Sequence, residues 1–153
     1  IAISLSKLIK KSLIYAADIS PKALKIADEN SSKHAANILF FESDLFKNIS
    51  KLYKFDIIVS NPPYIETEVI NTLSEEVKKE PQIALDGGID GLDFYRQIIQ
   101  EAKDYLNENG YLAFEIGYNQ KQSVEKLFKD NGYKNIYSRK DLAGNDRIVV
   151  GQI

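Results

Sequence analysis

The chain has 153 residues, of which 44% are hydrophobic and 27% are charged, as is typical of one globular domain with its own core. It has no cysteine and a single histidine, His34, which excludes thiolate catalysis and argues against a Ser-His-Asp triad. For the same reason we expect no metal site. The formal net charge is −2 and only three arginines are present. We therefore do not expect direct binding of nucleic acid, which depends on clustered cations.

No apolar run approaches the roughly eighteen residues of a membrane span, and no signal-peptide pattern opens the chain. We therefore expect a cytoplasmic protein without a membrane partner. The sequence starts at Ile1 and contains no methionine, so we expect it to be the downstream part of a longer protein.

Apolar periodicity and turn residues predict alternating helices and strands along the chain. Helical spacing predicts helices at residues 1–9, 21–30, 92–106 and 120–131, with a short helix between residues 65 and 79. Short apolar runs predict strands at residues 13–17, 38–41, 55–59, 111–116, 133–140 and 147–153. Ser20 and Pro21 suit the cap and first position of a helix, and Gly132 suits a helix end.

The order of these elements predicts the fold class. The first three strands are rich in apolar residues, and we expect them to be buried in a parallel sheet. The last two flank a turn at Gly144-Asn145 and should pair antiparallel. The segment of residues 80–91, which is rich in glycine, predicts a long functional loop. Without a repeat or a second core, residues 1–153 should form one α/β domain with a doubly wound, mostly parallel sheet.

Polar side chains follow three of the predicted strands: Asp18, Asp44 and Asn61. Since parallel strands share a direction, we expect all three at one rim of the sheet, where a cofactor could span them. Asp18 is placed to accept hydrogen bonds from the two hydroxyls of a ribose, or it is a helix-capping or solvated carboxylate. Asp44 could accept from the amino group of a purine, but an exposed loop acid or the N-cap of residues 45–48 is an equal alternative.

The sharpest local feature is Asn61-Pro62-Pro63-Tyr64, directly after the third strand. The two prolines fix φ and lack an N–H, so the loop is stiff and its carbonyl groups face outward as unpaired acceptors. One such carbonyl and the Asn61 side-chain oxygen can accept from both N–H groups of a planar NH2, while the Tyr64 ring packs on its face. A rigid turn is the alternative for an isolated Asn-Pro-Pro. Tyr64 and the preceding strand favour a binding site.

Such a clamp suits transfer of a methyl group to nitrogen. An amide or aromatic amine nitrogen attacks carbon poorly because its lone pair is delocalised, so it needs orientation more than deprotonation. Two acceptors favour the positive charge that develops on the nitrogen, and a sulfonium methyl is the matching electrophile. The methylated nitrogen is acidic enough to lose its proton to water, so the scarcity of histidine and cysteine is no objection.

At these residues the sequence resembles the catalytic domain of the HemK/PrmC family of class I S-adenosylmethionine-dependent methyltransferases, the peptide chain release factor glutamine methyltransferases. The resemblance covers essentially the whole chain. The segments that carry it are Ala17-Asp18-Ile19-Ser20-Pro21, Ser43-Asp44-Leu45-Phe46, Val59-Ser60-Asn61-Pro62-Pro63-Tyr64-Ile65, Glu80-Pro81, Gly87-Gly88, Asp90-Gly91-Leu92, Glu115-Ile116-Gly117, Asp141-Leu142-Ala143-Gly144 and Asp146-Arg147.

The resemblance implies a function. The substrate would be the glutamine of the Gly-Gly-Gln motif in a release factor, methylated on its side-chain amide. Asn61 and the Pro62 carbonyl would hold this amide as catalytic groups, with Pro63 completing the substrate loop and Tyr64 packing on the amide. S-adenosylmethionine would be the cofactor, with Asp18 at its ribose, Asp44 at its adenine and Asn61 at the same rim.

Two points depart from the family pattern or stay open. The first strand and the glycine-rich cofactor loop of the family should lie directly before Ile1, so we expect a sheet without its first strand and weak cofactor binding by this segment alone. The roles of Glu80 and Gly87-Gly88 stay open, with a loop scaffold as the simplest interpretation, and Asp90 is a candidate cap of the next helix.

Two other functions stay open. One is an amino-group methyltransferase for adenine or guanine in DNA or RNA, because the same clamp suits an exocyclic NH2. The other is a catalytically inactive α/β binding domain that retains a rigid turn.

Overall fold

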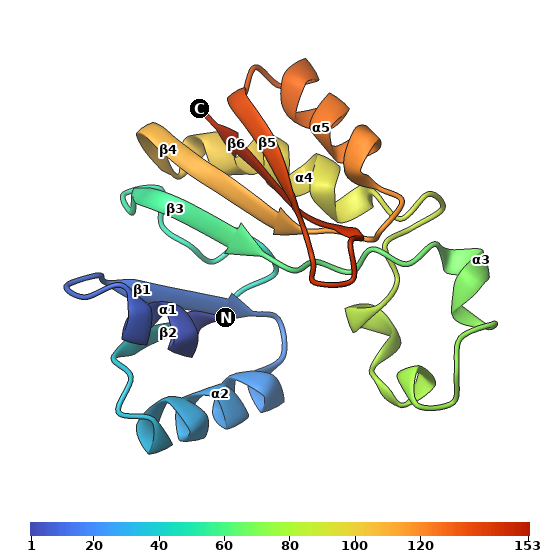
Figure 1. Ribbon diagram of the computed structural model, residues 1–153. Helices are drawn as coiled ribbons and strands as arrows, with labels where there is room; N and C mark the ends of the chain where they lie inside the picture. Colours follow the sequence, from blue (N-terminus) through green and yellow to red (C-terminus); the bar gives the residue numbers. More distant parts are fainter. The chain divides into compact units, whose positions relative to one another are not determined.

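The computed structural model describes residues 1–153, which form two compact units, Ile1–Ser50 and Lys51–Ile153 (Figure 1). None of its helices combines the length and the apolar character that a membrane crossing requires.

The first unit is a strand–helix–strand arrangement preceded by a short helix. Its elements are α1 (Ala2–Leu8), β1 (Ile14–Asp18), α2 (Pro21–Lys33) and β2 (Ile38–Glu42). The Ser20 hydroxyl accepts the N–H of Ala23 at 3.3 Å, and Pro21 opens α2. This confirms the predicted start of the helix, which ends three residues later than predicted. β1 and β2 pair in parallel, with Asp18 opposite Glu42 at their carboxyl ends.

The second unit contains a four-stranded mixed sheet. Its elements are β3 (Phe55–Ser60), α3 (Thr67–Ile70), the 3-10 helices η1 (Val77–Lys79) and η2 (Gln82–Ala84), α4 (Asp93–Glu101), the 3-10 helix η3 (Ala102–Asp104), β4 (Leu106–Glu115), α5 (Lys121–Asp130), β5 (Lys134–Lys140) and β6 (Asp146–Gln152). The strand order is β3-β4-β6-β5; β3 is parallel to β4, and β6 is antiparallel to both of its neighbours. The predicted α/β class and the antiparallel C-terminal strand are confirmed.

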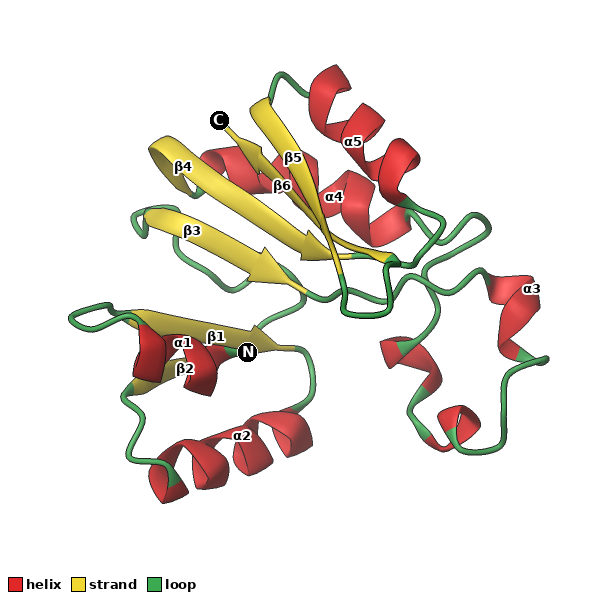
Figure 2. Cartoon of the chain, in the orientation of Figure 1, coloured by secondary structure: helices red, strands yellow, loops and turns green.

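The core of this unit lies on one face of β4. Leu112 and Phe114 of β4 alternate with exposed or half-buried residues, Ile116 directly after the strand continues the pattern, and each of the three is at most 1% exposed. The Phe114 ring contacts Tyr95 of α4 at a centroid distance of 5.0 Å and Phe128 of α5 at 5.6 Å. Since both rings meet the same side chain, α4 and α5 cover the same face of the sheet (Figure 2).

The strands are divided between two sheets, because no strand pairs with both β1 and β3. Unpaired strand edges are what we expected of a sheet without its first strand. The expected burial of the first three strands, in contrast, is wrong. β1, β2 and β3 contain no fully buried residue, and Leu39 and Ile57 are each 53% exposed. The physical reason is that each of these strands lies at the edge of its sheet.

The predicted helix at residues 92–106 is shorter than expected. α4 ends at Glu101, and the chain tightens into η3 and enters β4 at Leu106. Leu106 pairs with Phe55, and the strand register shifts before Ile57 pairs with Tyr111. The residues that were expected to separate a helix from a strand therefore form an irregular start of β4, with Asn109 at a φ of 62°.

Two tyrosine hydroxyls are buried in the core of the second unit. The Tyr95 hydroxyl donates to the carbonyl of Glu115 and the Tyr133 hydroxyl to the carbonyl of Ile99, both at 3.0 Å. Burial raises the pKa of both phenols, because a phenolate there would lose its solvation.

We expect the free energy of unfolding to fall above about pH 10. Below that pH the phenols are protonated in both states. Above it they ionise in the unfolded chain but not in the fold, so each lowers stability by up to about 1.4 kcal/mol per pH unit. Urea titrations at about pH 9 and about pH 11 test this with wild type and Tyr133→Phe. The variant should lose less stability over this interval, and an equal loss in both proteins would contradict the assignment.

Candidate active site

The loop Asn61-Pro62-Pro63-Tyr64 begins where β3 ends. Ser60 still pairs with Phe114 of β4, but the two prolines that follow have no N–H with which to continue the ladder. Pro62 is buried, whereas Asn61 is exposed and its carboxamide makes no hydrogen bond within the protein. The Asn61 side chain is therefore available to bind a ligand at the end of the strand.

A cavity of about 420 Å³ opens beside this loop, and Asn61, Pro62 and Tyr64 form part of its wall. The rest of the wall comes from the segment that follows the loop: Ile65, Leu73, Val77, Glu80, Ala84 and Leu85. A mostly apolar cavity of this size with a few polar groups is typical of a small-ligand site. Glu80, whose role the sequence left open, is the only acidic residue in the wall.

A second cavity, of about 540 Å³, is lined by residues of α3, η2, the glycine-rich loop and α4. None of the residues predicted for the active site lines it. The cavity beside Asn61 is therefore the candidate active site.

The glycine-rich loop, residues 80–91, packs backbone to backbone against residues 61–64, called the substrate loop after the role that the resemblance implies. A Cβ on Gly87 would lie 2.7 Å from the Cα of Tyr64 and 2.9 Å from the carbonyl oxygen of Pro63. Gly91, at a φ of +69°, would bring a Cβ to 2.4 Å from the Tyr64 carbonyl oxygen. Only glycine allows this close approach. The structure thus supports a scaffold role for this loop.

Hydrogen bonds join the same two loops. The Ile65 N–H donates to the carbonyl of Leu85 at 3.0 Å, and the Gly87 N–H donates to the carbonyl of Ile65 at 2.8 Å. The Asp86 carboxylate accepts from the Thr67 hydroxyl at 2.7 Å and from the Gly88 N–H at 3.0 Å. These bonds favour the charged form and lower the pKa of Asp86.

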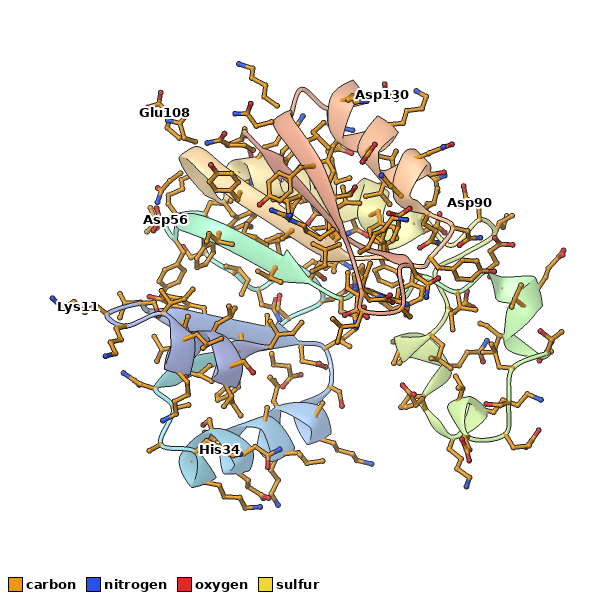
Figure 3. All side chains as sticks on the ribbon, in the orientation of Figure 1. Lys11, His34, Asp56, Asp90, Glu108 and Asp130 are labelled. Atoms are coloured by element: carbon orange, nitrogen blue, oxygen red, sulfur yellow. The ribbon has the colours of Figure 1, made fainter.

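Neither Asp90 nor His34 lines the cavity. Figure 3 labels His34 at α2 and Asp90 near α4. Asp90 accepts the Leu92 N–H at 3.2 Å and pairs with Arg96 of α4, which lowers the pKa of Asp90. Asp90 is not the cap that we expected: the N-cap of α4 is Leu92 and no side chain caps the helix, because Asp90 lies two residues before that position and holds the preceding turn instead. His34 is an exposed residue at the end of α2.

One buried polar side chain at the substrate loop was not predicted. Gln120, at the start of α5, is 7% exposed, and its amide donates to the Tyr64 carbonyl at 2.9 Å. From the sequence alone, we expect Gln120 only at the start of a helix. The two partners are 56 residues apart, and such a contact leaves no local pattern. The residue nearest to Gln120 that the resemblance singled out is Gly117, three residues earlier, whose N–H donates to the Gln120 amide oxygen.

The first unit places Asp18 and Asp44 at the same end of the β1–β2 sheet, where Asp18 pairs with Glu42. Asp18 is exposed, and its Oδ1 accepts the Ser20 N–H at 2.8 Å. Its Oδ2 makes no hydrogen bond within the protein. Asp44 forms an ion pair with Lys47. The hydroxyl of Ser43, not the carboxylate of Asp44, accepts the backbone N–H of Asn48 in the following turn.

The fold is that of class I methyltransferases. A crystal structure of a methyltransferase from Pyrococcus furiosus matches 97% of this chain and 66% of its own, with a TM-score of 0.71 at 18% identity. Residues 1–89, more than half of the chain, match the sequence model of the methyltransferase small domain. The chain belongs to this family.

Curated relatives confirm the resemblance that the motifs predicted. The chain is 45% identical over 154 residues to a release factor glutamine methyltransferase of Fusobacterium nucleatum, covering 99% of this chain and 44% of the relative. It is 41% identical over 154 residues to one of Geobacter sulfurreducens, covering 100% of this chain and 54% of the relative. The chain thus spans about half the length of the curated relatives it matches.

Proposed function

We propose that the protein containing this chain transfers a methyl group from S-adenosylmethionine to the side-chain amide of the glutamine in a Gly-Gly-Gln segment of a peptide chain release factor. The observation that carries this proposal is the cavity beside the substrate loop, with the unpaired Asn61 carboxamide in its wall. The names of the relatives support the choice of substrate. A cytoplasmic location is part of the proposal.

The cavity suits a glutamine side chain. Its apolar wall accepts the methylene groups, while the Asn61 oxygen and the Pro62 carbonyl accept the two N–H groups of the amide. Two acceptors hold the nitrogen in one orientation and favour the positive charge that develops on it. The glycines before the glutamine have no side chains, so that segment can approach the wall closely.

S-adenosylmethionine, when bound, supplies an electrophilic methyl group. Asp18 fits its ribose, because the exposed carboxylate has an oxygen without a hydrogen-bond partner at the carboxyl end of a parallel strand. Asp44 would lie toward the adenine. We also propose that residues 1–153 belong to one catalytic domain, because the match to the family runs through Ser50, where the two compact units divide.

A methyl-transfer assay with radiolabelled cofactor tests the substrate class. The complete protein is incubated with a release factor, with DNA and with RNA in separate reactions. We expect label on the release factor alone, because the net charge of this chain, −2, does not favour nucleic acid. Label on nucleic acid alone would replace the proposal by the amino-group methyltransferase alternative.

A further inference from the structure

The amide of Gln120 joins three segments of the second unit. Its Nε2 donates to the carbonyl oxygens of Tyr64 at 2.9 Å and Gly91 at 3.2 Å, and its Oε1 accepts the N–H of Gly117 at 3.0 Å. The hydroxyl of Tyr95 lies 3.4 Å from the same Oε1. Both amide protons and the acceptor are therefore used inside the protein, and the side chain has a single orientation.

Glycine at two of these contacts leaves the room that the amide occupies. A Cβ on Gly91 would lie 2.7 Å from Nε2 of Gln120, and a Cβ on Gly117 would lie 2.9 Å from its Oε1. Real Cβ atoms essentially never come closer than 3.0 Å to such neighbours. The close approach of three backbones around one amide thus depends on the absence of side chains at both positions.

The hydrogen bond from Gln120 to the Tyr64 carbonyl, called the anchor below, matters because the prolines of the substrate loop cannot donate backbone hydrogen bonds. Pro62 and Pro63 have no N–H, and the Asn61 side chain makes no hydrogen bond within the protein. The Tyr64 carbonyl, held by Gln120, is therefore the first group after the prolines that is fixed by a side chain, one residue before Ile65 pairs with the glycine-rich loop.

We propose that Gln120 is a positioning residue of the methyl-transfer site: it fixes the substrate loop through the Tyr64 carbonyl, so that Asn61 and the Pro62 carbonyl hold the amide in a reactive orientation. Gln120 does not line the cavity, so we expect no contact between its side chain and the substrate. This inference rests on the proposed function. Misplacement of a reacting group by about 1 Å can lower the rate about 100-fold, so the effect should appear in kcat.

The test compares Gln120→Ala with Val124→Ala in the complete protein. Val124 is fully buried on the same helix, and its side chain has no group that can donate or accept a hydrogen bond. It therefore serves as a control for lost stability. Both proteins are assayed well below their unfolding temperatures with a Gly-Gly-Gln peptide. We expect Gln120→Ala to lower kcat about 100-fold with KM changed less than about fivefold, and Val124→Ala to stay within about twofold of wild type. Equal kcat values in the two variants would overturn the proposal.

Amide hydrogen exchange supplies a readout that does not need catalysis. The N–H groups of Ile65 and Gly87 link the two loops and should exchange at least about tenfold faster in Gln120→Ala than in Val124→Ala. Equal exchange rates of these two N–H groups in Gln120→Ala and Val124→Ala would overturn the proposal that Gln120 fixes the loop. Should wild type methylate no Gly-Gly-Gln peptide, the proposed function fails, and the exchange result alone decides whether Gln120 anchors the loop.

Gln120→Glu is the second variant, in case the alanine variant does not fold. A carboxylate oxygen would face the carbonyls of Tyr64 and Gly91, and only a protonated carboxyl could donate to one of them. The activity of this variant relative to wild type should therefore rise several-fold as the pH falls from about 8 to about 6. A ratio independent of pH would count against the anchor.

Discussion

Replacement of Asn61 by alanine is expected to lower kcat by about 100- to 1,000-fold, the range typical for loss of one preorganised polar group that stabilises a transition state. The side chain is exposed in the wall of the cavity and makes no hydrogen bond within the protein, so its removal should not destabilise the fold. Initial rates with saturating Gly-Gly-Gln peptide measure the effect.

The matched control for this variant is Asn37→Ala. Asn37 is an exposed asparagine just before β2, outside the cavity and the proposed cofactor residues. It should keep wild-type kcat. If Asn61→Ala also keeps wild-type activity, the loop is only a rigid turn, and the interpretation as an inactive binding domain gains support.

Replacement of Gly91 by alanine should destabilise the second unit by about 4 kcal/mol and abolish methyl transfer. A positive φ costs a non-glycine residue about 1–3 kcal/mol, and overpacking costs a further 1–3 kcal/mol or so. Here the new Cβ would lie 2.4 Å from the Tyr64 carbonyl oxygen, which is backbone and cannot move without the substrate loop. Urea unfolding measures the first effect, and the peptide assay measures the second.

Gly132→Ala separates the two contributions. Gly132 has a φ of +81°, similar to that of Gly91, but a Cβ there would meet nothing within 4 Å. The Gly132→Ala substitution should lower the free energy of unfolding by only about 1–2 kcal/mol and leave methyl transfer unchanged. Equal losses of stability in the two variants would show that the contact between Gly91 and Tyr64 is not tight.

Much of the fold could be predicted from local signals. Ser20 and Pro21 mark the start of α2, and each predicted apolar run overlaps a strand of the structure. The short α4 could not be predicted, because it depends on which distant strands pair. Leu106 joins β4 by pairing with Phe55, a contact across about fifty residues that leaves no periodicity in either segment.

The candidate site divides in the same way. The substrate loop was recognisable because two prolines and a tyrosine directly after a strand have local consequences for backbone and chemistry. The far wall of the cavity, which includes Leu73 and Glu80, and the anchor at Gln120 were not predicted. These residues reach the loop only through tertiary packing, and their own neighbours in the chain resemble an ordinary polar loop and an ordinary helix start.

The proposed transfer to the glutamine side chain is tested by locating the methyl group in the product. A Gly-Gly-Gln peptide and a matching Gly-Gly-Glu peptide are each incubated with the complete protein and S-adenosylmethionine, and the products are fragmented in a tandem mass spectrometer. We expect one methyl group, on the glutamine side chain, and an unmodified glutamate peptide, because a carboxylate has no N–H groups for Asn61 and the Pro62 carbonyl to hold. Methylation of the glutamate peptide, or of any other position, would contradict the proposed transfer.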